Sequence, residues 1–186
     1  MLNVSQLKKG TFVKINSQPY IIVSSDMAHV GRGGNILRAK LKNLITGATK
    51  EETFRGADSV EEADITKVIA QYLYNDPNYL YFMTVEDYEQ VAVPSAIGKN
   101  ALPYLTEGLS VTILCFDQKP ATIELPAKVD LKVTSASDAV RGNTAQGSGY
   151  KEVTLETNTI FSAPMFIKEG DTIRINTDTG EYVERV

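Results

Sequence analysis

The sequence has 186 residues, of which 42% are hydrophobic and 23% are charged, as is usual for a globular protein in water. It contains no run of about 18 apolar residues, which argues against a transmembrane helix. Its first nine residues lack the basic start and long apolar stretch of a secretory signal. The single cysteine, Cys115, cannot form an internal disulfide, so we expect a cytoplasmic protein.

Charge is distributed unevenly along the chain. Residues 1–57 hold nine Lys/Arg and three Asp/Glu, a net charge of +6, whereas residues 58–186 hold ten and twenty, a net charge of −10, and together they give −4. A basic N-terminal third suggests that this part of the protein meets phosphate, and chance variation in surface charge is the alternative.

A glycine-rich loop at residues 29–35 stands between two strand-like runs, residues 20–25 and 36–42. Two such runs joined by a Gly/Asn-rich stretch predict a β-hairpin. Glycine permits the positive φ values of a tight turn and leaves the backbone bare, so Arg32 is expected to project furthest. An ordinary hairpin with a solvated arginine is the alternative to a functional tip.

The strand after this loop alternates in polarity. Its two-residue period puts Leu37, Ala39 and Leu41 on one face and three cations on the other, namely Arg38, Lys40 and Lys42. A row of cations beside a cationic tip is suited to a phosphate backbone. With a turn at residues 46–47 and a strand at 50–54, the first segment is expected to form a small β-barrel.

An acidic stretch at residues 58–64 separates the first segment from the second. It lacks the alternating ligands and central glycine of a calcium loop, so we interpret it as a solvated linker. Beyond it, the tyrosine-rich runs 72–74 and 79–83 flank turn residues and predict another hairpin. Its aromatic side chains are expected mostly in the core, although stacking on bases is the alternative.

The remaining elements are one helix and several short strands. Apolar residues recur at three and four positions between residues 95 and 105, which predicts a short helix. Strands are expected at residues 109–116, 121–125, 153–161, 163–167, 171–176 and 181–186, with a loop at 135–151. Short strands with few helices predict an all-β fold of three consecutive small barrels, with domains at 1–64, 65–127 and 128–186.

No constellation of catalytic residues is apparent. His29 is the only histidine, Cys115 lies in an apolar run, and neither a nucleophile motif nor a phosphate-binding loop nor a zinc-ligand set occurs. We therefore expect a non-enzymatic protein without a metal or cofactor.

Motifs in all three segments together resemble the bacterial elongation factor P family. In the first segment these are Gly31-Arg32-Gly33, the run at 38–44 and Thr53-Phe54-Arg55. The second contributes the runs at 72–76, 82–83 and 88–90, and the third contributes those at 142–145, 164–167 and 180–186. The resemblance rests on the order and spacing of these motifs along the whole chain.

The resemblance implies an SH3-like, KOW-like N-terminal barrel followed by two OB-fold barrels, arranged as a tRNA-like L. It also implies a monomeric, cytoplasmic factor without a membrane partner. Such factors bind the 70S ribosome between the P and E sites and relieve stalling at consecutive prolines.

The resemblance implies a role for several residues. The tip loop, Gly31, Arg32 and Gly33, contacts the P-site peptidyl-tRNA, and Arg32 is a candidate for rhamnosylation by a dedicated transferase. The loop Gly142, Asn143 and Thr144 faces the E-site mRNA codon, whereas Tyr182 and Arg185 contact tRNA and the small subunit.

Some positions depart from the family pattern. Val30 replaces the usual Pro before the tip, Asn143 replaces Asp, Asn158 replaces Gly and Ala163 replaces Val. A generic single-stranded RNA-binding protein and a specialised paralogue of the family are the alternative functions.

Overall fold

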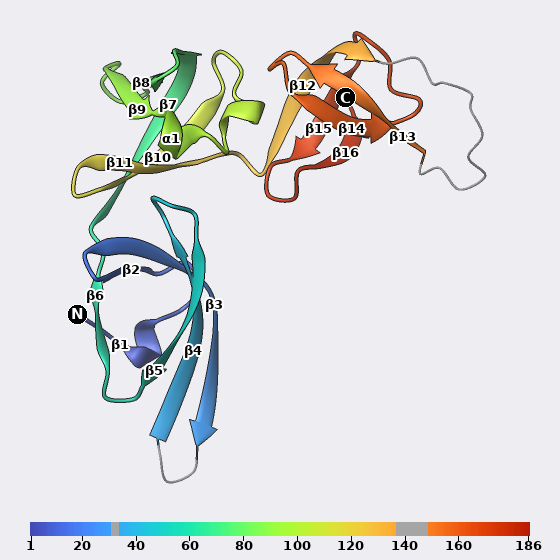
Figure 1. Ribbon diagram of the computed structural model, residues 1–186. Coiled ribbons are helices and arrows are strands. Elements are labelled where there is room, and N and C mark those ends of the chain that lie inside the picture. Colours follow the sequence, from blue (N-terminus) through green and yellow to red (C-terminus); the bar gives the residue numbers. More distant parts are fainter. Residues whose placement is uncertain (31–33, 137–148) are drawn as a thin grey trace. The chain divides into compact units, whose positions relative to one another are not determined.

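The computed structural model of the chain describes the backbone of residues 1–30, 34–136 and 149–186, and the side chains of these residues except 29, 30, 34 and 35 (Figure 1). The described residues form mainly β-strands. Helical structure within these ranges is confined to α1, Ser95–Gly98, and the 3-10 helices η1, Val4–Gln6, and η3, Leu102–Tyr104. No helix in these ranges is long and apolar enough to cross a membrane.

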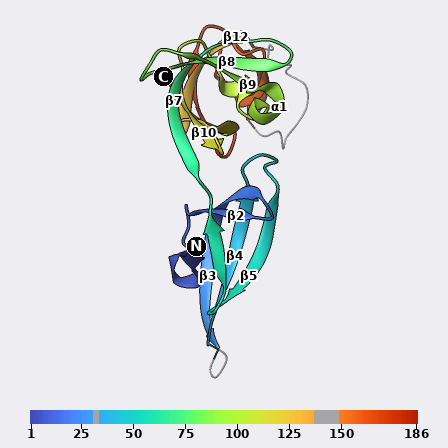
Figure 2. The ribbon, with the colours of Figure 1, turned by 90° about the vertical axis from the view of Figure 1, so that its left-hand side faces the viewer.

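The first sheet is antiparallel and has the strand order β1-β6-β2-β3-β4-β5 (Figures 1 and 2). Apolar residues alternate along its strands and so lie on one face of the sheet, where they form a hydrophobic core. This core includes Val13, Ile22 and Leu41, each with no exposed surface. The strands are β1, Leu2–Asn3; β2, Phe12–Ile15; β3, Gln18–Val30; β4, Gly34–Asn43; β5, Thr49–Arg55; and β6, Ser59–Glu62.

The central sheet has the order β11-β10-β7-β8-β9. Its strands are β7, Ile65–Asn75; β8, Tyr79–Thr84; β9, Gln90–Pro94; β10, Ser110–Phe116; and β11, Lys119–Glu124. The predicted hairpin is present, since Tyr74 pairs with Tyr81 and Asn75 with Leu80.

The helix expected over residues 95–105 is much shorter than predicted. Helix α1 ends at Gly98, and a 3-10 helix that carries Pro103 near its start follows. Glycine and proline are poor formers of helix interiors, which accounts for the break. A Cβ atom on Gly98 would lie 1.9 Å from Leu80 Cδ1, so any larger residue at this position would have to displace the buried Leu80 side chain.

The third sheet has the order β14-β13-β12-β15-β16. Its core includes Leu131, Val133 and Ile173, all without exposed surface. The strands are β12, Lys128–Ala136; β13, Tyr150–Leu155; β14, Ile160–Pro164; β15, Thr172–Asn176; and β16, Glu181–Arg185.

The single strand predicted over residues 153–161 is wrong, because a turn separates β13 from β14. In this turn Asn158 has φ = 60° and donates its backbone N–H to the Leu155 carbonyl at 2.8 Å. Glycine adopts such a φ without strain, and asparagine is among the few other residues that tolerate it. The turn therefore accommodates the asparagine at this position.

The chain divides into two compact units. One contains residues 1–68 and 113–122, and the other contains residues 69–112 and 123–186. Within the first unit, Leu114, Phe116 and Ala121 pack with Leu44 and Ala63 in a small buried cluster. The predicted domain boundaries after residues 64 and 127 remain a prediction.

Candidate functional site

The longest strand pair in the N-terminal sheet is the β3–β4 hairpin. Its register continues from Tyr20 opposite Asn43 to Val30 opposite Gly34, so the connection is shorter than the loop predicted over residues 29–35. Strand β5 pairs with β4 only as far as Arg55 opposite Ile36. Beyond that point the hairpin has two strands, and both lead to residues 31–33 (Figure 1).

Several predicted site residues lie outside the described part of the chain. They are the tip residues Gly31, Arg32 and Gly33 and the loop residues Gly142, Asn143 and Thr144. The strands on either side of the tip, β3 and β4, are described. The loop that contains residues 142–144 is flanked by β12, which ends at Ala136, and β13, which begins at Tyr150.

The cationic face of β4 is exposed along its length. Arg38, Lys40 and Lys42 lie on the solvent side, whereas Leu37, Ala39 and Leu41 are at most 2% exposed. The sequence did not reveal which residues face these cations. Asp26 of β3 is opposite Arg38, and Glu51 of β5 is opposite Lys40.

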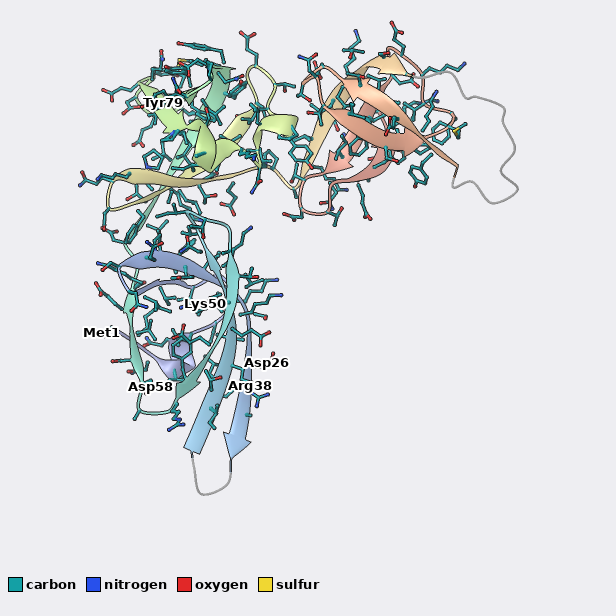
Figure 3. The ribbon with its side chains drawn as sticks, viewed as in Figure 1. Met1, Asp26, Arg38, Lys50, Asp58 and Tyr79 are labelled. Atoms are coloured by element: carbon teal, nitrogen blue, oxygen red, sulfur yellow. The ribbon has the colours of Figure 1, made fainter. Side chains whose placement is uncertain are left out.

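Residues directly opposite in an antiparallel pair share one face of the sheet, so each of these two cations has a carboxylate as a neighbour. Figure 3 shows Asp26 and Arg38 on adjacent strands of the hairpin. Lys42 differs, because Ile21 and Thr49 are opposite it. The face therefore attracts phosphate less strongly than three isolated cations would.

Lys50 belongs to a different environment from the three face cations. Its ammonium lies 2.8 Å from a Glu52 carboxylate oxygen and 4.6 Å from the centre of the Tyr20 ring. An ion pair and a cation–π contact already engage this charge, so we do not group Lys50 with the three exposed cations of β4.

Two predicted C-terminal residues, Tyr182 and Arg185, meet at a third side chain. The Phe166 ring lies edge-on to Tyr182, with centroids 6.4 Å apart, and the Arg185 guanidinium carbon is 6.0 Å from the centre of the Phe166 ring. Arg185 also lies 3.6 Å from Asp171. Phe166 belongs to a family-like motif, but nothing in the sequence marked it as the residue joining these two.

The neighbouring Arg174 is held by two acids. It donates to both Asp130 oxygens at 2.7 and 2.9 Å and to Glu184 at 2.8 Å. These contacts lower the pKa of the Asp130 carboxyl and raise that of Arg174. Arg174 is thus a structural cation of the third sheet, whereas Arg185 has a longer and looser ion pair.

The aromatic residues of the central sheet fall into two groups. Tyr72 and Phe82 are buried and pack edge-on at 5.5 Å, as the core interpretation predicts. That interpretation is wrong for Tyr74 and Tyr79, which are 52% and 43% exposed.

Groups that could support catalysis or metal binding are sparse in the described residues. Cys115 is half-buried, and burial raises the pKa of its thiol, which keeps it protonated and weakly nucleophilic. Within the described ranges no three His, Cys, Asp or Glu side chains gather as metal ligands do.

Comparison with known proteins accounts for nearly the whole chain. Three family models match it: the elongation factor P KOW-like domain at residues 3–60, the elongation factor P OB domain at 65–123, and the elongation factor P C-terminal domain at 129–185. A solved structure titled eukaryotic translation initiation factor 5A, from Methanococcus jannaschii, has a TM-score of 0.55 and 23% identity. The match covers 67% of this chain and 91% of that one and shows a shared fold.

Two relatives match this chain over its whole length with substantial sequence identity. Elongation factor P from Clostridium acetobutylicum is 42% identical over 188 residues, and that from Petrotoga mobilis is 39% identical over 185, each match covering 100% of both chains. The all-β prediction, with a KOW-like domain followed by OB domains, is confirmed. The chain belongs to the elongation factor P family and is a translation elongation factor.

Proposed function

We propose that the chain binds the ribosome between the P and E sites and stimulates peptide-bond formation, relieving stalling at consecutive prolines. Family membership supports this role. The observation that carries it is the β3–β4 hairpin, which continues past the end of β5 as two strands joined by a three-residue connection centred on Arg32. Such a scaffold is suited to presenting one long cationic side chain away from the body of the sheet.

The proposed mechanism is positioning, with the ribosome forming the bond. A prolyl donor or acceptor reacts slowly, and holding the reactants in a near-attack geometry lowers the barrier by up to several kcal/mol. Arg32 supplies a permanent charge and up to five N–H donors to phosphate and ribose oxygens of the P-site peptidyl-tRNA. Gly31 and Gly33 flank it without side chains that would compete for that space.

The other contacts belong to the same proposal. Arg38, Lys40 and Lys42 face phosphates, Gly142, Asn143 and Thr144 face the E-site mRNA codon, and Tyr182 and Arg185 contact tRNA and the small subunit. The exposed position of the three cations on β4 and the shared contact of Tyr182 and Arg185 with Phe166 support these assignments.

Ribosome pelleting and a polyproline reporter test the proposal together. The wild-type protein should pellet with ribosomes and speed synthesis across consecutive prolines, whereas Arg32→Ala should lose most of the rescue. We expect its stability to stay unchanged, because the sequence predicts a solvated side chain at this position, which would bury little surface. Lys9→Ala, which removes an exposed cation of the same domain, is the control. Tight binding to free single-stranded RNA with no affinity for ribosomes would favour the generic RNA-binding alternative instead.

Arg32→Lys and intact mass examine the chemistry of the tip. If charge alone orders the peptidyl-tRNA, lysine should retain much of the activity. If the planar guanidinium or a sugar attached to it is required, lysine should fail. Rhamnosylation by a dedicated transferase would add about 146 Da to the protein isolated from its native host.

A further inference from the structure

One face of the β7–β8 strand pair carries a cluster of three tyrosines, the exposed Tyr74 and Tyr79 and the half-buried Tyr81, which we call the tyrosine face. The register places Tyr74 opposite Tyr81, and Tyr81 opposite Ala92 of β9. Tyr79 and Tyr81 lie two residues apart on β8 and so share one side of the sheet. Figure 3 shows Tyr79 on this sheet.

The three rings form a connected cluster. The Tyr74 and Tyr81 rings stack at 4.6 Å with an interplanar angle of 26°, and Tyr79 lies 6.3 Å from Tyr81. Two hydrogen bonds fix the orientation of the stack. The Tyr81 hydroxyl donates to Asp76 at 2.9 Å, and the Gln90 amide donates to the Tyr74 hydroxyl at 3.3 Å.

Packing inside the protein does not account for this cluster. Tyr74 and Tyr79 are 52% and 43% exposed, whereas Tyr72 and Phe82, on the opposite side of the same strands, are 6% and 0% exposed. Further along the same strand pair, Ile69 of β7 and Val85, which follows β8, are 59% and 47% exposed. Exposed apolar patches that extend over several residues commonly mark binding surfaces.

Acidic residues lie in the turns before and after strand β8, and one of them, Asp76, accepts a hydrogen bond from Tyr81. Residues 69–112 contain five Asp/Glu and one Lys. Four of these acids flank β8: Asp76 in the turn before the strand, and Glu86, Asp87 and Glu89 in the turn after it. The Asp76 carboxylate accepts backbone N–H groups of Tyr79 and Asn78 at 2.7 Å, which stabilises its charged form at neutral pH.

We propose that the tyrosine face binds an arginine-rich segment of a partner protein. Aromatic rings with nearby carboxylates suit a guanidinium, which stacks on the ring face and forms ion pairs at its edge. The same acids repel phosphate, so RNA is disfavoured here although the rings alone would accept bases. This inference concerns a surface remote in sequence from the tip loop and does not depend on the ribosomal role.

Peptide titrations of the full chain test the proposal. The probes are labelled hexa-arginine, hexalysine and hexauridine, measured by fluorescence anisotropy at about 0.15 M salt, where long-range attraction is largely screened. The test variant is Tyr74→Leu with Tyr79→Leu, which removes two rings without changing charge. Tyr74→Phe with Tyr79→Phe keeps the rings, and Tyr150→Leu, at a residue 53% exposed in the third sheet, is the matched control.

We expect hexa-arginine to bind more tightly than hexalysine, with the leucine variant weakened about five- to tenfold by the loss of two cation–π contacts. The phenylalanine variant and the Tyr150→Leu control should bind like the wild type. A leucine variant that binds hexa-arginine as tightly as the wild type would overturn the proposal, as would equal binding of the two peptides. Hexauridine binding that is lost in the leucine variant would instead identify the face as an RNA surface. Should the double variant fail to fold, Tyr79→Leu alone must show at least a twofold loss.

Discussion

Neutralising the cationic face of β4 should weaken ribosome binding and lower its dependence on salt. Each cation that displaces a counterion from phosphate contributes about 0.7 to 0.9 to the slope of log affinity against log salt. Three full contacts would therefore change the slope by about 2 to 2.7. Because Asp26 is opposite Arg38 and Glu51 opposite Lys40, we expect the triple change to Gln to lower it by less, roughly 1 to 2.

The strand register also predicts which single substitution to Gln changes the salt dependence of ribosome binding most. Lys42→Gln should have the largest effect, close to one full contact, since no carboxylate is opposite it. Asp26→Asn with Glu51→Gln should act in the reverse direction and tighten binding. Ribosome pelleting over a series of salt concentrations measures each slope, with Lys9→Gln as the control. An unchanged slope in the triple variant would refute phosphate contact by this face, and a Lys42→Gln effect smaller than that of Arg38→Gln would refute the assigned role of the facing acids.

Three further predictions concern stability. Asn158→Ala should lower the free energy of unfolding by about 1 to 2 kcal/mol because the turn holds φ at 60°, whereas Asn158→Gly should be nearly neutral; urea denaturation distinguishes them. Gly98→Ala should cost about 1 to 3 kcal/mol, because the new methyl group meets Leu80 and Ile123 in a buried site, and a thermal melt that matches the wild type would contradict this. Arg174 lowers the pKa of the Asp130 carboxyl in the folded protein. The ion pair therefore stabilises the fold fully above the unfolded pKa of about 3.9, and this stabilisation is lost as the pH falls through the folded pKa. Asp130→Asn should accordingly reduce the loss of stability at acid pH, which unfolding measured over a pH series would detect.

The alternation of β4 and the hairpin signals were readable in the sequence because they depend on local rules. Leu37, Ala39 and Leu41 follow the two-residue period of a strand with one buried face. The turn between β7 and β8 follows from Asn75-Asp76-Pro77-Asn78, where the Asp76 carboxylate caps the backbone N–H groups that follow it.

What the sequence did not show depends on contacts across the fold. The acids facing Arg38 and Lys40 come from two other strands, and only the register brings them together. Phe166 joins Tyr182 and Arg185 from a segment fifteen or more residues away. Burial of Tyr72 and exposure of Tyr74 depend on the irregularity in pairing between these residues, which a strict two-residue period would not produce.

The rate of peptide-bond formation between a prolyl donor and a prolyl acceptor, measured in a single turnover on purified ribosomes, tests the central claim most directly. The wild-type protein should accelerate this step, Arg32→Ala should return it close to the unassisted rate, and Lys9→Ala should behave like the wild type. Proline-specific acceleration that survives Arg32→Ala would contradict the assignment of the β3–β4 tip as the working part of the molecule.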